Sequence, residues 1–124
     1  MRDTFRFQKL KIWKDAILYA KHIYAIAEKL PKSEIFGLIS QLKRAALSIP
    51  SNIAEGSGST TVNDFSHYLD ISIKSAIETV SQLLFALEME YLSEEDITPL
   101  YDEAELLIKR TQSFKKSLRR NKNE

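Results

Sequence analysis

The chain has 124 residues, no cysteine, and a formal net charge of +1 from 18 Lys and Arg against 17 Asp and Glu. This length fits one domain with its own apolar core, and the lack of cysteine excludes disulfide and thiolate chemistry. A net charge near zero does not indicate which kind of partner the protein binds. No apolar run approaches the roughly 18 residues that a membrane span requires, and no signal-peptide pattern opens the sequence, so we expect no membrane partner. Three Gly and three Pro leave few places to turn, which favours a few long helices.

Apolar residues at helical spacing predict two helices in the first half of the chain. Residues 1–7 form a lead-in that could lie extended against the body. The first helix is expected over 8–30, where a proline ends it, with Trp13 as a core anchor. The second is expected within 34–58, where Gly56 and Gly58 supply a C-terminal stop.

The second half of the chain predicts two more amphipathic helices. The third should run to about Tyr91 from an N-cap at Thr61 or Asn63. The fourth should begin either at Ser93, which opens a capping-box pattern, or at Thr98, which precedes a proline suited to the first helical position.

Four amphipathic helices joined by short links predict an all-α fold, an antiparallel up-down four-helix bundle. We expect a single domain over residues 1–124, with the lead-in at 1–7 and a frayed tail at 121–124. No strand-like alternation is long enough to compete with this fold.

A polar stripe marks the second helix. Gln41, Arg44, Ser48, Asn52 and Glu55 recur at steps of three and four, so their side chains share one helix face. The stripe is either a solvated face or a hydrogen-bonded seam against another helix or another subunit. We favour the seam, because short, mixed polar side chains at a packed contact fix register and partner.

A proline interrupts the same helix. Pro50 removes one backbone donor and crowds the carbonyl of Ala46. We expect a kink there, with Asn52 or Ser48 helping to satisfy the carbonyl groups freed at Ala46 and Leu47.

The charged members of the stripe need partners from elsewhere. Arg44 and Glu55 lie about three helical turns apart and cannot pair within one straight helix. Ser75 and Glu78 on the third helix are the best candidate partners. We expect Arg44 to meet Glu78 or a carboxylate of a neighbouring subunit.

Charge is segregated along the chain. Residues 88–105 hold eight acids and no base, residues 109–122 hold seven bases and no acid, and residues 1–44 hold ten bases against four acids. An antiparallel bundle would bring the C-terminal bases near Arg2 and Arg6, and such a basic end suits phosphate groups. The candidate nucleic-acid contacts are Lys14, Lys21, Lys43, Arg44, Lys109, Arg110, Lys115, Lys116, Arg119 and Arg120.

The sequence offers little for catalysis. It has no cysteine nucleophile, no Gly-x-Ser-x-Gly motif and no glycine-rich phosphate loop. A di-iron carboxylate site in a bundle would need a Glu on each helix and two Glu-x-x-His pairs, whereas the chain offers one Asp64-x-x-His67. We therefore expect neither enzymatic activity nor a metal or other cofactor.

Two segments carry a resemblance to a known family. They are FQKLKIWK at 7–14 and FGLISQLKRAALSIPSNIAEG at 36–56, together with Ser75, Glu78 and Gln82 on the third helix. This pattern resembles the four-helix-bundle proteins named for intervening sequences in bacterial 23S ribosomal RNA genes. The chain differs from the family's common residues in the loop after the second helix and on the third helix.

The resemblance implies a bacterial cytoplasmic protein, a left-handed up-down bundle and a ring-shaped homopentamer. A relative, the accessory protein of diversity-generating retroelements, is a basic pentamer that binds nucleic acid and a reverse transcriptase. Ser59, Lys74 and Val80 stand where the family often has Arg, Gly and Glu. The motif positions that we expect to serve assembly are Gln41, Arg44, Ser48, Pro50, Asn52, Glu55, Gly56, Ser75 and Glu78.

These observations predict a non-enzymatic oligomeric scaffold that binds RNA or DNA through phosphate contacts. The alternative is a protein–protein adaptor without nucleic-acid affinity, in which the polar stripe serves assembly. A bundle that binds a small molecule or a metal is the third and weakest interpretation.

Overall fold

In the computed structural model, the described residues, 1–122, fold into four α-helices and two short 3-10 turns, with no strand, as predicted for an all-α protein. None of the helices formed by these residues is both long enough and apolar enough to cross a membrane. The last helix includes 121 and 122, which were expected to fray, and 123–124 lie outside the described residues. The elements are η1 (Arg6–Lys9), α1 (Lys11–Ala27), η2 (Lys32–Glu34), α2 (Leu38–Ser57), α3 (Val62–Glu88) and α4 (Glu94–Lys122).

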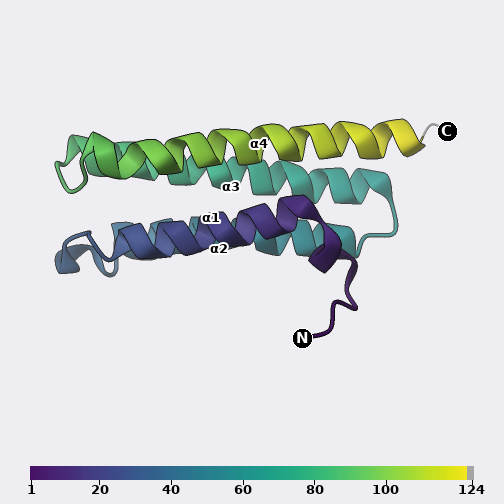
Figure 1. Ribbon diagram of the computed structural model, residues 1–124, viewed down its shortest axis with the longest axis horizontal. Helices are drawn as coiled ribbons and strands as arrows, with labels where there is room; N and C mark the ends of the chain where they lie inside the picture. The colour runs from purple at the N-terminus through teal and green to yellow at the C-terminus, as the bar shows by residue number, and fades with distance from the viewer. Residues whose placement is uncertain (123–124) are drawn as a thin grey trace.

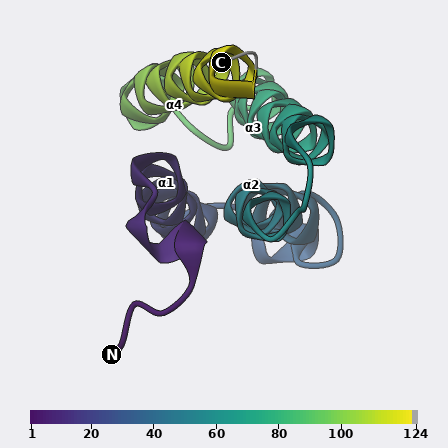
Figure 2. The same ribbon diagram turned by 90° about the vertical axis from the view of Figure 1, so that its right-hand side faces the viewer.

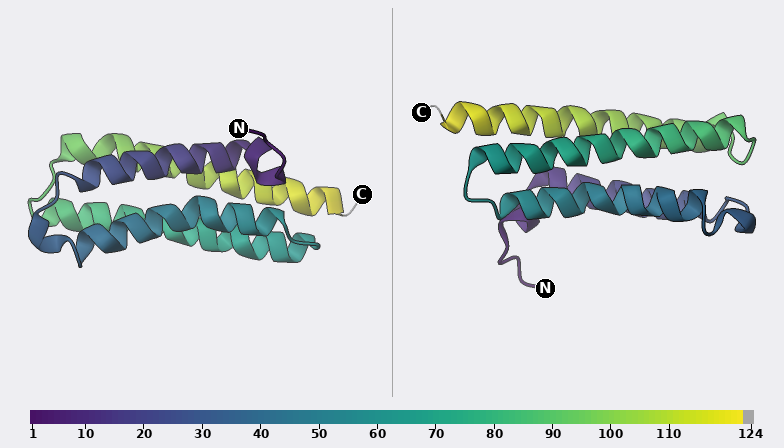
Figure 3. Two further views of the ribbon diagram at one scale, coloured as in Figure 1. Left: turned by 90° about the horizontal axis from the view of Figure 1, so that it is seen from below. Right: turned by 180° about the vertical axis from the view of Figure 1, so that it is seen from behind.

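The helices lie in two layers, α1 beside α2 and α3 beside α4, as the end-on view shows (Figure 2). The colour gradient reverses from each helix to the next in Figure 1, so successive helices run in opposite directions. The start of α1 and the end of α4 lie toward the same end of the molecule, and the views from below and behind agree (Figure 3). The left-handed twist implied by the resemblance stays a prediction.

The lead-in predicted over 1–7 is irregular over residues 1–5 and turns into the 3-10 turn η1 from Arg6. In η1 the Gln8 side-chain oxygen accepts a hydrogen bond from the Phe5 backbone N–H at 3.0 Å. Phe7 packs on Trp13 with ring centroids 5.0 Å apart. Trp13 is therefore half-buried at the edge of the core, and α1 begins at Lys11 rather than at residue 8.

Glu34 connects the link between α1 and α2 to the link between α3 and α4, at the end of the molecule away from η1. Its Oε1 accepts a hydrogen bond from the Leu38 N–H at 3.1 Å, so Glu34 caps α2 and lies outside it. Its Oε2 accepts a hydrogen bond from the Tyr91 hydroxyl at 3.2 Å. Loss of hydration, together with this bond and the charge of Glu34, raises the pKa of Tyr91.

Side-chain caps identify the starts of α3 and α4. Thr61 Oγ1 accepts from the Asp64 N–H at 3.1 Å, so Thr61 is the N-cap of α3. Ser93 Oγ accepts from the Asp96 N–H at 3.1 Å, while an Asp96 carboxylate oxygen accepts from the Ser93 N–H at 3.0 Å. This reciprocal capping box starts α4 at the earlier of the two expected positions and leaves Pro99 inside the helix.

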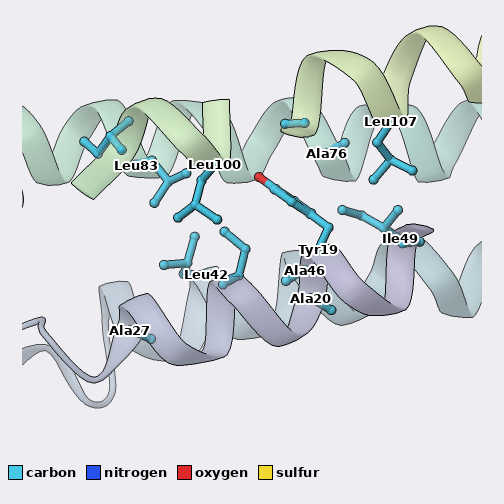
Figure 4. Close-up of a cluster of buried hydrophobic side chains, with 14 of the residues drawn as sticks. Tyr19, Ala20, Ala27, Leu42, Ala46, Ile49, Ala76, Leu83, Leu100 and Leu107 are labelled. Carbon is cyan, nitrogen blue, oxygen red and sulfur yellow. The ribbon is translucent and has the colours of Figure 1, made fainter. Parts of the chain in front are cut away.

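Tyr19 lies among the buried apolar side chains of the core (Figure 4). Tyr19 Oη lies 2.8 Å from Thr79 Oγ1, and Thr79 donates to the Ala76 carbonyl at 2.6 Å, so Tyr19 is the donor of the first bond. Burial raises the pKa of Tyr19 to about 12, which keeps this buried group neutral and bonded. The largest fully buried apolar side chains around it are Ile23, Leu42, Ile49, Ile53, Leu69 and Leu83.

Candidate functional site

Three polar residues of the family motif meet where α2 packs on α3. The hydroxyl oxygens of Ser48 and Ser75 lie 2.9 Å apart. The Asn52 side-chain amide donates to the Ser48 carbonyl at 2.8 Å and to the Ser48 hydroxyl at 2.9 Å. We call Ser48, Asn52 and Ser75 the α2–α3 seam, and all three side chains are half-buried.

A second polar contact between these helices was missed in the sequence. The Ser72 hydroxyl donates to the Ile49 carbonyl at 3.0 Å, inside the core. Ser72 lies within the apolar stripe of α3, between Leu69 and Ala76. A short polar residue within a buried stripe needs a bonding partner, and this signal could have identified it.

Pro50 is buried inside an α2 helix that runs through it without a break. The expected rescue of the carbonyls of Ala46 and Leu47 by Asn52 or Ser48 is wrong. Asn52 instead donates to the Ser48 carbonyl, because its amide folds back one turn along its own helix. The kink at Pro50 stays a prediction.

Gly56 packs against α3 and does not end α2, which continues to Ser57 and is capped by Gly58. A Cβ at Gly56 would lie 2.8 Å from Phe65 Cδ1 and 2.8 Å from Tyr68 Cβ. Only a residue without a side chain permits this approach of the two helices. The role expected for Gly56 as a helix stop is therefore replaced by a role in close packing.

The seam places Arg44 beside Glu78 without pairing them. Because α2 and α3 run in opposite directions, the Ser48–Ser75 contact sets Arg44 level with Glu78. Glu78 accepts instead from the Gln82 amide at 3.1 Å, and Arg44 forms no ion pair with any residue that the structure describes. The expected Arg44–Glu78 pair within one chain is thus absent from the described residues. The members of the stripe that face solvent are Gln41, Arg44 and Glu55.

Three of the candidate nucleic-acid contacts are engaged within the chain. Lys115 Nζ lies 2.6 Å from an Asp70 carboxylate oxygen, and Arg110 lies 3.2 Å from Asp15. Lys43 stands over the ring of a tyrosine of α1, 5.0 Å from its centroid. These cations are less available to phosphate than their positions in the sequence indicated.

The other candidate cations are exposed and take part in no ion pair among residues 1–121. Lys14 and Lys21 share one face of α1 two turns apart, and Arg44 lies on α2, whereas four lie in the second half of α4. They are Lys14, Lys21, Arg44, Lys109, Lys116, Arg119 and Arg120.

A hollow of 630 Å³ between α3 and α4 gathers cations from both helices. Lys116 and Arg119 line it from α4, and Lys74, which was not a candidate, lines it from α3. Asp70 is the acid that lines it, and this carboxylate already binds Lys115. We call Lys74, Lys116 and Arg119 the basic hollow. Only the packing of α3 on α4 reveals that Lys74 belongs with these residues.

Aromatic contacts hold the lead-in at the same end of the bundle. The Arg6 guanidinium lies over the Phe65 ring, 5.1 Å from its centroid. Phe65 packs edge-on against Phe114 of α4, with ring centroids 5.6 Å apart. The bases of the lead-in and those of the second half of α4 therefore lie toward one end, as Figure 1 shows for the two chain ends.

The two histidines lie apart from each other. His22 Nδ1 lies 2.7 Å from a Glu103 carboxylate oxygen, which links α1 to α4. His67 is exposed beside the ring of Tyr68, with centroids 6.0 Å apart. Within the described part of the chain, no three His, Asp or Glu side chains form a group that could hold a metal ion.

Comparison with known proteins agrees with this fold. The crystal structure of a protein with unknown function from the S23 ribosomal protein family of Bacteroides thetaiotaomicron is similar, with a TM-score of 0.78 and 24% sequence identity. The match covers 85% of this chain and 98% of that one, and at this identity it supports the fold alone. No curated protein matches the chain. The sequence model of the 23S rRNA-intervening sequence proteins matches residues 8–113, and the chain belongs to this family.

Proposed function

We propose that this protein is a non-enzymatic oligomeric scaffold that binds RNA or DNA through phosphate contacts at its basic hollow. The observation that carries the proposal is the grouping of Lys74, Lys116 and Arg119 around a single acid, Asp70, that Lys115 already neutralises. Phosphate contacts of this kind carry no base readout, so binding should tolerate any sequence.

Assembly would multiply this weak site. The family resemblance supports a cytoplasmic homopentamer, in which one basic hollow per subunit repeats around a ring. Several weak phosphate contacts held at fixed spacing raise affinity without a base-specific group. Light scattering should then give a mass several times the 14.3 kDa of one chain.

The test is a binding titration of labelled single-stranded and duplex RNA and DNA across salt concentrations. Each phosphate neutralised should add roughly 0.7 to 0.9 to the slope of log K against log salt. Lys116→Gln with Arg119→Gln should flatten that slope, since both cations belong to the basic hollow.

The matched control changes Lys9 and Lys32 to Gln, which removes the same charge from exposed positions outside the basic hollow. This control should leave the slope nearly unchanged. Equal loss in both variants would assign binding to overall charge rather than to the hollow. If the wild-type protein binds no nucleic acid at low salt, where the electrostatic contribution is largest, the proposal fails.

A second candidate function is a protein–protein adaptor without nucleic-acid affinity. The observation that favours it is a set of exposed apolar side chains on α3 and α4, among them Ile77, Leu84 and Tyr101. Such a patch is typical of protein contact sites. Absence of nucleic-acid binding together with retained assembly would support this function.

A further inference from the structure

A groove with an apolar floor lies between α3 and α4, on residues that the nucleic-acid proposal does not use. It has a volume of 510 Å³, and its lining comes from these two helices alone. A hollow of 230 Å³ continues it toward the start of α4 and shares Leu84 and Tyr101 with it. We call this combined surface the α3–α4 groove. Its apolar floor consists of Ile77, Val80, Leu84, Leu87, Ile97, Tyr101 and Ile108.

The floor includes a second apolar stripe on α3, separate from the core stripe. Ile77 and Leu84 are seven residues apart and share a helix face, and they are 53% and 41% exposed. Tyr101 faces them from α4 and is 43% exposed. These side chains lie outside the core of the bundle, whereas Ala76 and Leu83 beside them on α3 belong to it. Apolar area left in water at helical spacing is a mark of a contact surface.

The two ends of the groove carry opposite charges. Glu94 lines its end near the start of α4. Glu105 and Lys109 line its other half, and the basic hollow continues it past Ile77 and Gln112, which line both. A complementary occupant therefore needs basic groups at one end and acidic groups at the other.

We propose that the α3–α4 groove binds one amphipathic helix of a partner protein, with basic residues near Glu94 and acidic residues near Lys109. From Ile97 to Gln112 the groove runs for roughly 22 Å at about 1.5 Å per residue, which matches a helix of about four turns. Tyr101 supplies the kind of aromatic anchor that often dominates such contacts.

The chemistry of the floor selects a helix over an extended peptide. The residues that the structure describes form no strand, so an extended peptide would find no sheet edge to pair with. Its backbone amides would lie unpaired against apolar side chains, whereas a helix bonds its own backbone and presents only side chains.

The exposed faces of α1 and α2 offer no comparable helix as an occupant. Each of the four helices already turns its main apolar stripe into the core. The large apolar residues left on α1, Leu18 and Tyr24, lie six residues apart and point to different sides. On α2, Leu47 is the exposed large apolar side chain. A partner protein with a free amphipathic helix therefore fits the groove better than α1 or α2 of a second copy does.

The test measures fluorescence anisotropy of labelled helical peptides of about 18 residues, with leucines at i, i+3, i+4 and i+7. The probe peptide carries arginines at one end and glutamates at the other. One comparison peptide carries glutamates at both ends, and a second has the same composition with its leucines scattered around the helix. We expect the probe peptide to bind at least about tenfold more tightly than either comparison peptide.

Ile77→Gln with Leu84→Gln should weaken binding of the probe peptide by about tenfold or more. Leu47→Gln is the matched control, since Leu47 is 50% exposed on α2 outside the groove, and it should change binding less than about twofold. Both variants keep every cation, so the nucleic-acid titration should be unchanged and a failure here is separate from a failure there. Circular dichroism and melting confirm that the variants are folded.

Three results would overturn the proposal. One is that wild-type protein binds no probe peptide better than the scattered-leucine peptide. Another is that Leu47→Gln weakens binding as much as the Ile77 and Leu84 changes. The third is that these groove changes lower the oligomeric mass, because the groove would then be filled by a second copy of the chain.

Discussion

The hydroxyl of Ser48 lies 2.9 Å from the hydroxyl of Ser75, and this contact sets the register of α2 against α3. The same register brings Gly56 against Phe65 and sets Arg44 level with Glu78. Much of the family motif on α2 therefore serves to fix the position of α2 along α3.

We predict that Ser48 and Ser75 stabilise the fold jointly. Ser75→Ala should lower the free energy of unfolding by about 1 kcal/mol, because the half-buried Ser48 hydroxyl loses a partner. In a double-mutant cycle measured by urea unfolding, Ser48→Ala and Ser75→Ala should couple by about 0.5–1.5 kcal/mol. Ser51→Ala, at an exposed position of α2, is the control. Strictly additive losses would mean that the 2.9 Å contact contributes nothing to stability.

We predict that Gly56 tolerates no side chain while Gly58 does. Gly56→Ala places a methyl group 2.8 Å from atoms of Phe65 and Tyr68, so α3 must shift. The free energy of unfolding should fall by about 1–3 kcal/mol, as overpacking a core typically costs.

Gly58→Ala is the matched control for that change. The nearest atom to its added methyl would be 3.5 Å away, an ordinary contact, and its φ of −87° suits any residue. Urea unfolding of the two variants should therefore differ clearly. If Gly56→Ala were as stable as wild type, α3 would be able to shift away from the added methyl group without a loss of folding free energy.

Sequence periodicity predicted what depends on single helices, but it located only part of what depends on pairs of helices. The apolar stripes indicated four helices, because each stripe is a property of one helix and its core-facing side. The choice between Ser93 and Thr98 as the cap of α4 stayed open, since both residues fit the local rules and the bond between Ser93 and Asp96 decides between them.

The site was predicted less completely for the same reason. Ser72 stands out in the sequence as a polar residue in a buried stripe, yet its partner Ile49, and the place of Lys74 in the basic hollow, appear only when α3 is packed against α2 and α4. Local residue preferences also assigned Gly56 to a helix end, whereas the crossing of α2 and α3 requires it.

We predict an acid-dependent loss of stability at the start of α4. A hydrogen bond from Lys29 first, and then the backbone N–H of Ser93, lower the pKa of Asp96 from 3.8 to about 2. A carboxyl group whose pKa is lower in the folded state than in the unfolded state stabilises the fold above the unfolded pKa. Its contribution is therefore complete above about pH 4 and is lost as the pH falls toward about 2.

Urea unfolding of wild type and Asp96→Asn across this pH range checks the prediction. The stability difference between the two proteins should shrink as the pH falls. Protonation of Asp96 removes from wild type the carboxylate charge that Asp96→Asn lacks at every pH. Glu55→Gln, at an exposed acid without an ion pair among the described residues, is the control and should show no such convergence. A constant difference for Asp96→Asn would show that the Lys29 contact does not lower the pKa of Asp96.

We predict that Arg44 acts in assembly rather than in the fold of one chain. Its guanidinium is exposed, and it forms no ion pair with the residues that the structure describes, although the seam sets it level with Glu78. In a complex of identical chains, a carboxylate of a neighbouring subunit would form an ion pair with Arg44. Removing one member of a charge pair that assembly buries typically costs about 3–5 kcal/mol.

Arg44→Ala should therefore lower the oligomeric mass measured by light scattering across a dilution series, while the circular dichroism spectrum keeps its helical content. Lys14→Ala is the matched control, because Lys14 is an exposed cation of α1 outside the seam, and its mass should equal that of wild type. Arg44→Lys should restore assembly only in part, since lysine keeps the charge but loses the planar fork that binds a carboxylate through two hydrogen bonds. If Arg44→Ala assembles like wild type at every dilution, Arg44 is solvated in the assembly and belongs with the nucleic-acid contacts, where its loss should instead lower the salt dependence of RNA binding.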